Sequence, residues 1–180
     1  NDYGDPPLNA ALEHQDENAI DALLWRRGLG QDPNEVNLYK ENALHTAARK
    51  GCRLPLFHRI LGMIDNVNAG NEDGYTALME AARTNHLDMV TALMNHPGID
   101  VNAQNRFNLT ALHCAVYNKH PAIVAQLLSD HRIDTSLKDK INNYTPLELA
   151  TARGRRECAK LLREHEREAG GSMAGIWQES

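Results

Sequence analysis

A repeat with a nearly fixed interval runs through this chain of 180 residues and constrains its fold more than any other feature. Leucines recur 34, 34 and 35 residues apart, at Leu44, Leu78, Leu112 and Leu147. Two further series keep this interval: Ala47, Ala81, Ala115 and Ala150, and Ile60, Leu93, Leu127 and Leu161. Self-similarity of this length is typical of a solenoid, in which short units stack on their neighbours instead of sharing one globular core.

The residues inside one interval predict a pair of short helices. Thr76, Thr110 and Thr145 each precede an apolar run, where a threonine can cap the free backbone N–H groups of a helix. The segments 89–90 and 93–94 are apolar and three to four residues apart, which predicts an apolar stripe along the second helix. Because each pair alone leaves its apolar side half covered, the units must stack.

A six-residue motif opens the later units. It reads Thr-Ala-Leu-Met-Glu-Ala at 76–81, Thr-Ala-Leu-His-Cys-Ala at 110–115 and Thr-Pro-Leu-Glu-Leu-Ala at 145–150, with Asn-Ala-Leu-His-Thr-Ala at 42–47. These segments resemble the T-P-L-H-x-A signature of ankyrin repeats, and the resemblance spans roughly residues 5–165. It implies an all-α repeat solenoid, an ankyrin-type stack of helix-turn-helix units joined by β-hairpin loops.

The resemblance divides the chain into one ankyrin-repeat domain, residues 1–169, and a tail. We expect five units, at about residues 5–37, 38–69, 70–103, 104–136 and 137–168, of which the polar first and last units act as caps. Gly170, Gly171 and Ser172 are typical of a linker, so residues 170–180 are expected to form a flexible linker and tail. Three origins stay open for the tail: a cloning remnant, a linker to a missing domain, or a short ligand, anchored by Ile176 and Trp177, fused to its own receptor.

Composition argues against several classes of partner. The net charge of −5 offers no overall attraction to nucleic acid, so no nucleic-acid partner is expected. No run of about 18 apolar residues occurs, so no membrane insertion is expected.

Cys52, Cys114 and Cys158 are odd in number and differ in repeat position, which favours buried thiols in a reducing, cytoplasmic compartment over disulfides. We expect the chain to be monomeric on its own.

No residue pattern predicts catalysis, so we expect a chain that is not an enzyme and holds no metal or cofactor. His113 and Cys114 are adjacent, and neighbours on a helix point about 100° apart, which prevents a nucleophile–base pair. Neither a C-x-x-C pair nor an H-E-x-x-H motif occurs. The resemblance instead implies that His45 and His113 bond to neighbouring backbone and order the hairpin loops.

Ankyrin repeats commonly bind partners on a concave surface, which the hairpin tips and the exposed side of each first helix form. Carried onto this chain, the resemblance implies these partner-binding residues: Leu38, Tyr39, Arg49, Lys50, Glu72, Asp73, Tyr75, Arg83, Arg106, Phe107, Leu109, Tyr117, Asn118, Ile141, Asn142, Tyr144 and Arg153. Five of the chain's seven Tyr and Phe residues belong to this set, and aromatic enrichment is typical of binding hot spots.

Two properties of this surface stay open at the level of sequence. The aromatics could instead pack between adjacent hairpins, although packing residues should repeat at one register position and these alternate between two. A basic stripe would suit an acidic or phosphorylated peptide, although Glu41, Glu72 and Asp73 oppose it. The stripe consists of Arg49, Lys50, Arg83, Arg106 and Arg153.

We therefore predict a non-catalytic protein–protein interaction scaffold that binds a protein or peptide partner in its concave groove. The alternative is a substrate- or host-targeting module of a longer enzyme, or of a secreted bacterial effector that would act in the host cytosol. The start at Asn1 rather than Met suggests a segment of a longer protein. Residues 95–102 and 129–134 resemble repeats of bacterial ankyrin effectors.

Overall fold

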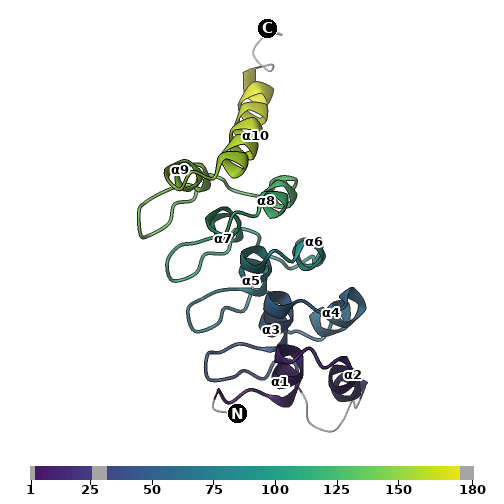
Figure 1. The fold of residues 1–180 in the computed structure, drawn as a ribbon. Helices are drawn as coiled ribbons and strands as arrows, with labels where there is room; N and C mark the ends of the chain where they lie inside the picture. Colours follow the sequence, from purple (N-terminus) through teal and green to yellow (C-terminus); the bar gives the residue numbers. More distant parts are fainter. Residues whose placement is uncertain (1–2, 26–31, 175–180) are drawn as a thin grey trace.

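The computed structural model describes residues 3–25 and 32–174, and within these ranges it contains ten helices and no strand. The first helices of the five pairs form an inner layer: α1 (Pro7–Glu13), α3 (Ala43–Lys50), α5 (Ala77–Thr84), α7 (Ala111–Tyr117) and α9 (Pro146–Ala152). The second helices form an outer layer: α2 (Glu17–Trp25), α4 (Leu54–Leu61), α6 (Leu87–Met94), α8 (Pro121–Leu128) and α10 (Arg156–Ala174). Figure 1 shows the inner column between the outer helices and a row of long loops, which confirms the predicted all-α repeat solenoid.

The inner helices begin at the predicted caps. The hydroxyl oxygens of Thr76, Thr110 and Thr145 each accept a hydrogen bond from the backbone N–H three residues later. Asn42 replaces this threonine in the second unit, and its side chain accepts from two backbone N–H groups. A single polar side chain therefore starts each of these four helices, as capping predicts.

The core is continuous through the stack. The alanines of the repeat lie between neighbouring inner helices with no exposed surface, because a small side chain lets two helices approach closely: Ala47, Ala81, Ala115 and Ala150. Leu44, Leu78 and Leu112 are equally buried, whereas Leu147 in the last unit is only partly buried. The last unit has a neighbour on one side alone, so its leucine is less covered.

The loops that precede the inner helices are closed by an Asx residue rather than by a strand ladder. Its side-chain oxygen accepts from backbone N–H groups further along the loop, as in Asn105, which binds the N–H of Phe107 at 2.9 Å and of Leu109 at 3.0 Å. The same role falls to residues 34 positions apart, namely Asn37, Asn71, Asn105 and Asp139. The loops fold back on themselves as β-hairpin loops do, but their two arms form no strand in the described residues.

The last helix differs from our prediction. We expected a flexible linker from Gly170, but α10 continues through Gly170, Gly171 and Ser172 to Ala174. Helix propagation adds one hydrogen bond per residue, so a glycine that costs about 1 kcal/mol does not by itself end a helix that is already formed. The proposed tail anchors Ile176 and Trp177 lie outside the described residues. None of the described helices is long and apolar enough to cross a membrane.

Candidate partner-binding surface

The predicted surface is hollowed at its N-terminal end. A depression of about 310 Å³ lies between the loops of the first two units and the helices α1 and α3. Tyr3 and Tyr39 both line it, and their rings lie 6.0 Å apart at an angle of 41°. Its remaining lining residues are Asp5, Glu13, His14, Asn37, Glu41 and Arg49.

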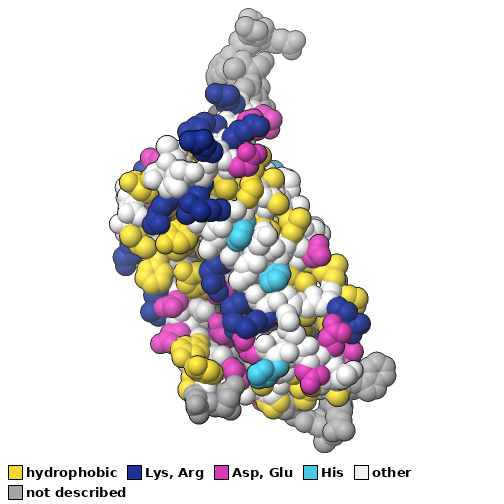
Figure 2. All heavy atoms as spheres, in the orientation of Figure 1, with side chains coloured by type: hydrophobic (Ala, Val, Ile, Leu, Met, Phe, Trp, Pro, Cys, Tyr) yellow, Lys and Arg dark blue, Asp and Glu magenta, His cyan; other side chains and the backbone are white. Residues whose placement is uncertain are grey.

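Several of the predicted binding residues are solvent-exposed. At the loop tips the exposed fraction reaches 71% for Leu38 and 68% for Ile141. Tyr39, Phe107 and Tyr117 are exposed as well, although apolar rings gain free energy when they are buried. Figure 2 shows apolar side chains among charged ones on the face where the loops lie. Burial of these exposed apolar side chains against a partner would therefore contribute the most favourable free energy on this surface.

The aromatic residues divide by their position in the loop. Tyr75 and Tyr144, each directly before a capping threonine, are partly buried and pack against the core, as Leu109 does at the same position. Burial raises the pKa of the Tyr75 phenol, which Asn105 opposes by hydrogen bonding. The packing alternative therefore applies to these three residues. Tyr39 and Phe107, three residues before the cap, are the exposed ones.

Most of the predicted basic stripe is neutralised by the protein itself. Arg49 pairs with Glu13 and Glu41, and Lys50 reaches Glu13 at 2.8 Å. Arg83 binds the buried Glu80 at 2.5 Å. These carboxylates already supply the acceptors that an acidic partner would otherwise provide, so the stripe is a poor site for an extended acidic segment in units two and three.

The last two members of the basic stripe, Arg106 and Arg153, differ from each other in their contacts. Arg106 binds Asp73 at 2.9 Å and also donates to the backbone carbonyl of Glu72. Arg153 makes no ion pair within the described residues, and its guanidinium stacks over the Tyr117 ring at 4.6 Å from the centroid. The uncompensated positive charge of the stripe therefore lies in its last member, Arg153, towards the C-terminal end.

The other predicted residues contribute to the scaffold or remain exposed. The amide of Asn118 donates to the carbonyl of Cys114 at 2.8 Å and helps to end α7. Glu72 donates its backbone N–H to the carbonyl of Tyr39 at 2.7 Å, one of the bonds that tie neighbouring tips together. Asn142 is exposed at the last tip.

A model of the family of ankyrin repeats, in three copies, matches residues 8–105 and 97–170. The chain belongs to the ankyrin-repeat family. A search of curated proteins found no match. Ankyrin repeats are in general modules that bind other proteins and are typically non-catalytic.

The motif histidines of this ankyrin stack have the expected structural role. His113 Nε2 lies 3.1 Å from the carbonyl of Tyr144 in the next unit, and Nδ1 accepts from the Thr110 N–H at 3.3 Å. His45 reaches the carbonyls of Ala69 and Tyr75 in the same manner. Burial lowers the pKa of both imidazoles, which keeps the neutral form that these bonds require.

Two further histidines, His86 and His120, share one register position of the repeat. His86 Nε2 lies 3.1 Å from the carbonyl of Arg49, and His120 Nε2 lies 3.1 Å from the carbonyl of Arg83. In the last unit Arg155 takes this place and donates to the carbonyl of Tyr117 at 3.3 Å. The 34-residue spacing of the histidines is the signal that would have shown this role.

Sequence reasoning missed several residues of the surface. Tyr3 belongs to the first loop, and its carbonyl accepts from the N–H of Leu38 at 3.1 Å, the first of the bonds between tips. Glu13 and Glu80 were not predicted: Glu13 pairs with Arg49 of the next unit, and Glu80 pairs with Arg83 within α5. The series of Asx residues every 34 positions was visible in the sequence.

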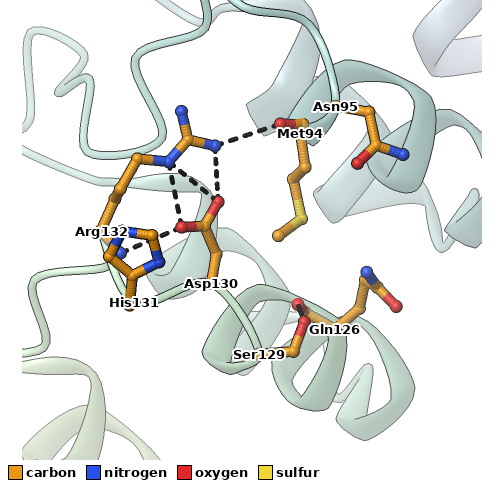
Figure 3. Close-up of a pocket in the computed structure, with 7 residues that line it drawn as sticks. All are labelled: Met94, Asn95, Gln126, Ser129, Asp130, His131 and Arg132. Atoms are coloured by element: carbon orange, nitrogen blue, oxygen red, sulfur yellow. Dashed lines mark hydrogen bonds and ion pairs between the residues drawn. The ribbon is translucent and has the colours of Figure 1, made fainter.

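A further depression lies on the outer layer, and its charged side chains already bind one another. It measures about 500 Å³ and opens between the ends of α6 and α8 (Figure 3). Arg132 binds Asp130 at 2.6 Å and the carbonyl of Met94 at 3.1 Å, and this hydrogen bonding lowers the pKa of Asp130 to about 2. The charges of this depression satisfy one another. Across the described residues, no cluster of three or more His, Cys, Asp or Glu side chains could hold a metal ion.

Proposed function

We propose that this ankyrin stack is a non-catalytic interaction module that binds a segment of another protein along the loop tips and the C-terminal ends of the inner helices. One observation carries the proposal: Tyr39, Phe107 and Tyr117 are exposed on the predicted surface, while the aromatics at the packing position are not. Exposed aromatic anchors flanked by polar groups are typical of binding hot spots.

The test replaces these three aromatics together, as Tyr39→Ala, Phe107→Ala and Tyr117→Ala. A partner captured by the unaltered chain from a lysate is purified, and its affinity is then measured for each form by titration calorimetry. We expect the variant to lose at least about thirtyfold in affinity, because a hot-spot residue contributes about 2 kcal/mol or more. Circular dichroism shows whether the variant keeps its helices.

The matched control removes exposed apolar side chains from the outer layer. Leu54 and Leu87, 38% and 39% exposed, start α4 and α6. A Leu54→Ala, Leu87→Ala variant should bind as the unaltered chain does. If the control loses the partner and the aromatic variant keeps it, the binding surface is the outer layer and the proposal is wrong.

A further inference from the structure

A small pocket at the C-terminal end of the stack lies beside the proposed binding surface. It measures about 270 Å³ and forms where the turn between α7 and α8 meets the turn between α9 and α10. Arg155 connects it to the surface, because this side chain donates to the carbonyl of Tyr117. The pocket is lined by Lys119, Pro121, Gly154, Arg155, Arg156, Glu157 and Cys158.

The pocket brings three cations together in one small space. Lys119, Arg155 and Arg156 line it together with a single carboxylate residue, Glu157. Within the described ranges none of these three cations forms an ion pair, in contrast to the arginines of units two to four. Figure 2 shows Lys and Arg side chains gathered towards the base of α10.

Arg155 has hydrogen-bonding capacity that the described part of the protein does not use. Its Nε is buried, yet it finds no hydrogen-bond acceptor among the described residues. The side chain as a whole is only partly buried, and a guanidinium has five N–H donors, so an anion that enters the pocket can accept from those that do not bind Tyr117. The first-turn N–H groups of α10 are free of intrahelical acceptors at the same place and favour an anion as well.

We propose that this pocket binds the phosphate group of a phosphorylated serine or threonine in the partner segment. The inference rests on the proposed function and names one feature of the partner. A phosphate carries a charge of about −1.5 to −2 and three acceptor oxygens, which match several cations around one small pocket. An extended acidic segment or a nucleic acid needs cations in a row, and the cations in a row here already bind Glu13, Glu80 and Asp73.

Arrayed peptides test the proposal directly. One library holds a central phosphoserine or phosphothreonine among random neighbours, and two matched libraries hold serine or glutamate at the same place. The unaltered chain should retain members of the phosphorylated library at least about tenfold more tightly than their serine and glutamate counterparts. Equal retention of the glutamate library would overturn the proposal in favour of an acidic segment. Displacement by a single-stranded oligonucleotide at lower concentration than by phosphopeptide would equally overturn it.

Two variants locate the binding. The triple substitution Lys119→Gln, Arg155→Gln and Arg156→Gln should weaken the retained phosphopeptides at least about tenfold. The single Arg156→Glu, at an exposed position with no ion pair to the described residues, should weaken them in a fold that stays intact. The control removes the same charge away from the loop tips, with Arg53→Gln and Arg59→Gln at α4 and Arg167→Gln on α10, and should not change retention. Unchanged binding by both pocket variants would refute the pocket.

The same array separates this inference from the proposed function. Loss of phosphopeptides by the pocket variants, with full retention by the variant of Tyr39, Phe107 and Tyr117, would support the pocket and contradict the aromatic surface. Partner binding that requires the aromatics but survives phosphatase treatment of the partner would support the surface and contradict the pocket.

Discussion

Gly51 and Gly154 follow inner helices with positive φ angles of 74° and 65°, but their surroundings differ. A Cβ at Gly51 would lie 2.7 Å from Cε1 of His86, whereas a Cβ at Gly154 would meet nothing within 4 Å. Both alanine substitutions strain the backbone, and only Gly51→Ala also displaces the imidazole that binds the carbonyl of Arg49. We expect Gly51→Ala to lower the free energy of unfolding by about 1 kcal/mol more than Gly154→Ala. Urea unfolding measures this difference, and equal losses would show that His86 adjusts freely.

The buried histidines predict a dependence of stability on pH. The pKa of His113 lies below its ordinary value of 6.5 because burial disfavours the charged ring, and protonation of Nδ1 would also break its bond from Thr110. The unfolded chain takes up protons as the pH falls through about 6.5, and the folded chain does so only at lower pH. This stability is therefore present above about pH 6.5 and is lost as the pH falls towards the folded pKa.

The measurement compares the unaltered chain with a His45→Gln, His113→Gln variant by urea unfolding at about pH 7.5 and about pH 5.5. The unaltered chain should lose stability between these values. The variant should be less stable at the higher pH but change less between the two, since its two buried sites no longer titrate. An equal change in both proteins would assign the pH dependence to other groups.

The conformation of the loop before α7 depends on the side chain of Asn105. Asn105 is 4% exposed and binds two backbone N–H groups of its loop, so Asn105→Ala should lower the free energy of unfolding by about 1 to 3 kcal/mol. Asn105→Asp should retain most of it, because Asp139 performs the same role in the last unit. The exposed Asn142→Ala provides the control, and a comparable loss there would contradict the argument.

The position of an aromatic within the loop separates packing from recognition. Tyr75 packs against the core, whereas Tyr39 is exposed. Tyr75→Ala should therefore lower the melting temperature by several degrees, while Tyr39→Ala should leave it nearly unchanged. Thermal melts followed by circular dichroism make the comparison. A larger shift for Tyr39 would mean that its contact with Tyr3 stabilises the first two units.

The whole molecule is a row of interfaces, and its ends are less covered than its middle. Leu112 and Leu147 occupy the same register position, but Leu112 is 1% exposed between two units and Leu147 is only partly buried. Leu112→Ala should cost about 2 to 5 kcal/mol, the range for a fully buried leucine, and Leu147→Ala clearly less. Equal costs in urea unfolding would indicate that residues after α9 cover Leu147 as well as a sixth unit would.

Charge is also distributed at the scale of the whole stack. Carboxylates of the first three units neutralise Arg49, Lys50 and Arg83, while the cations around the start of α10 have no such partner. A net charge of −5 conceals this division. The two ends of one surface therefore differ in what they offer to a partner.

Residue types at fixed local spacing were sufficient to predict the inner helices, their caps, the stacking leucines and the register. Thr76, Leu78 and Ala81 could be assigned from one unit and checked against the next. The sequence also predicted a region, the loop tips and inner helix ends, in which several residues are exposed. These features could be predicted because the same residue types recur at the same positions of successive repeats.

Which of those residues are available to a partner depends on contacts that form only when the units stack. Arg49 is neutralised by Glu13, 36 residues away, and Tyr75 packs against the core while Tyr39 does not. Such contacts join side chains of adjacent units, and their geometry depends on how the units rotate and translate as they stack. Spacing places two residues on neighbouring units, but the stacking itself determines whether their side chains meet, face the core or face solvent.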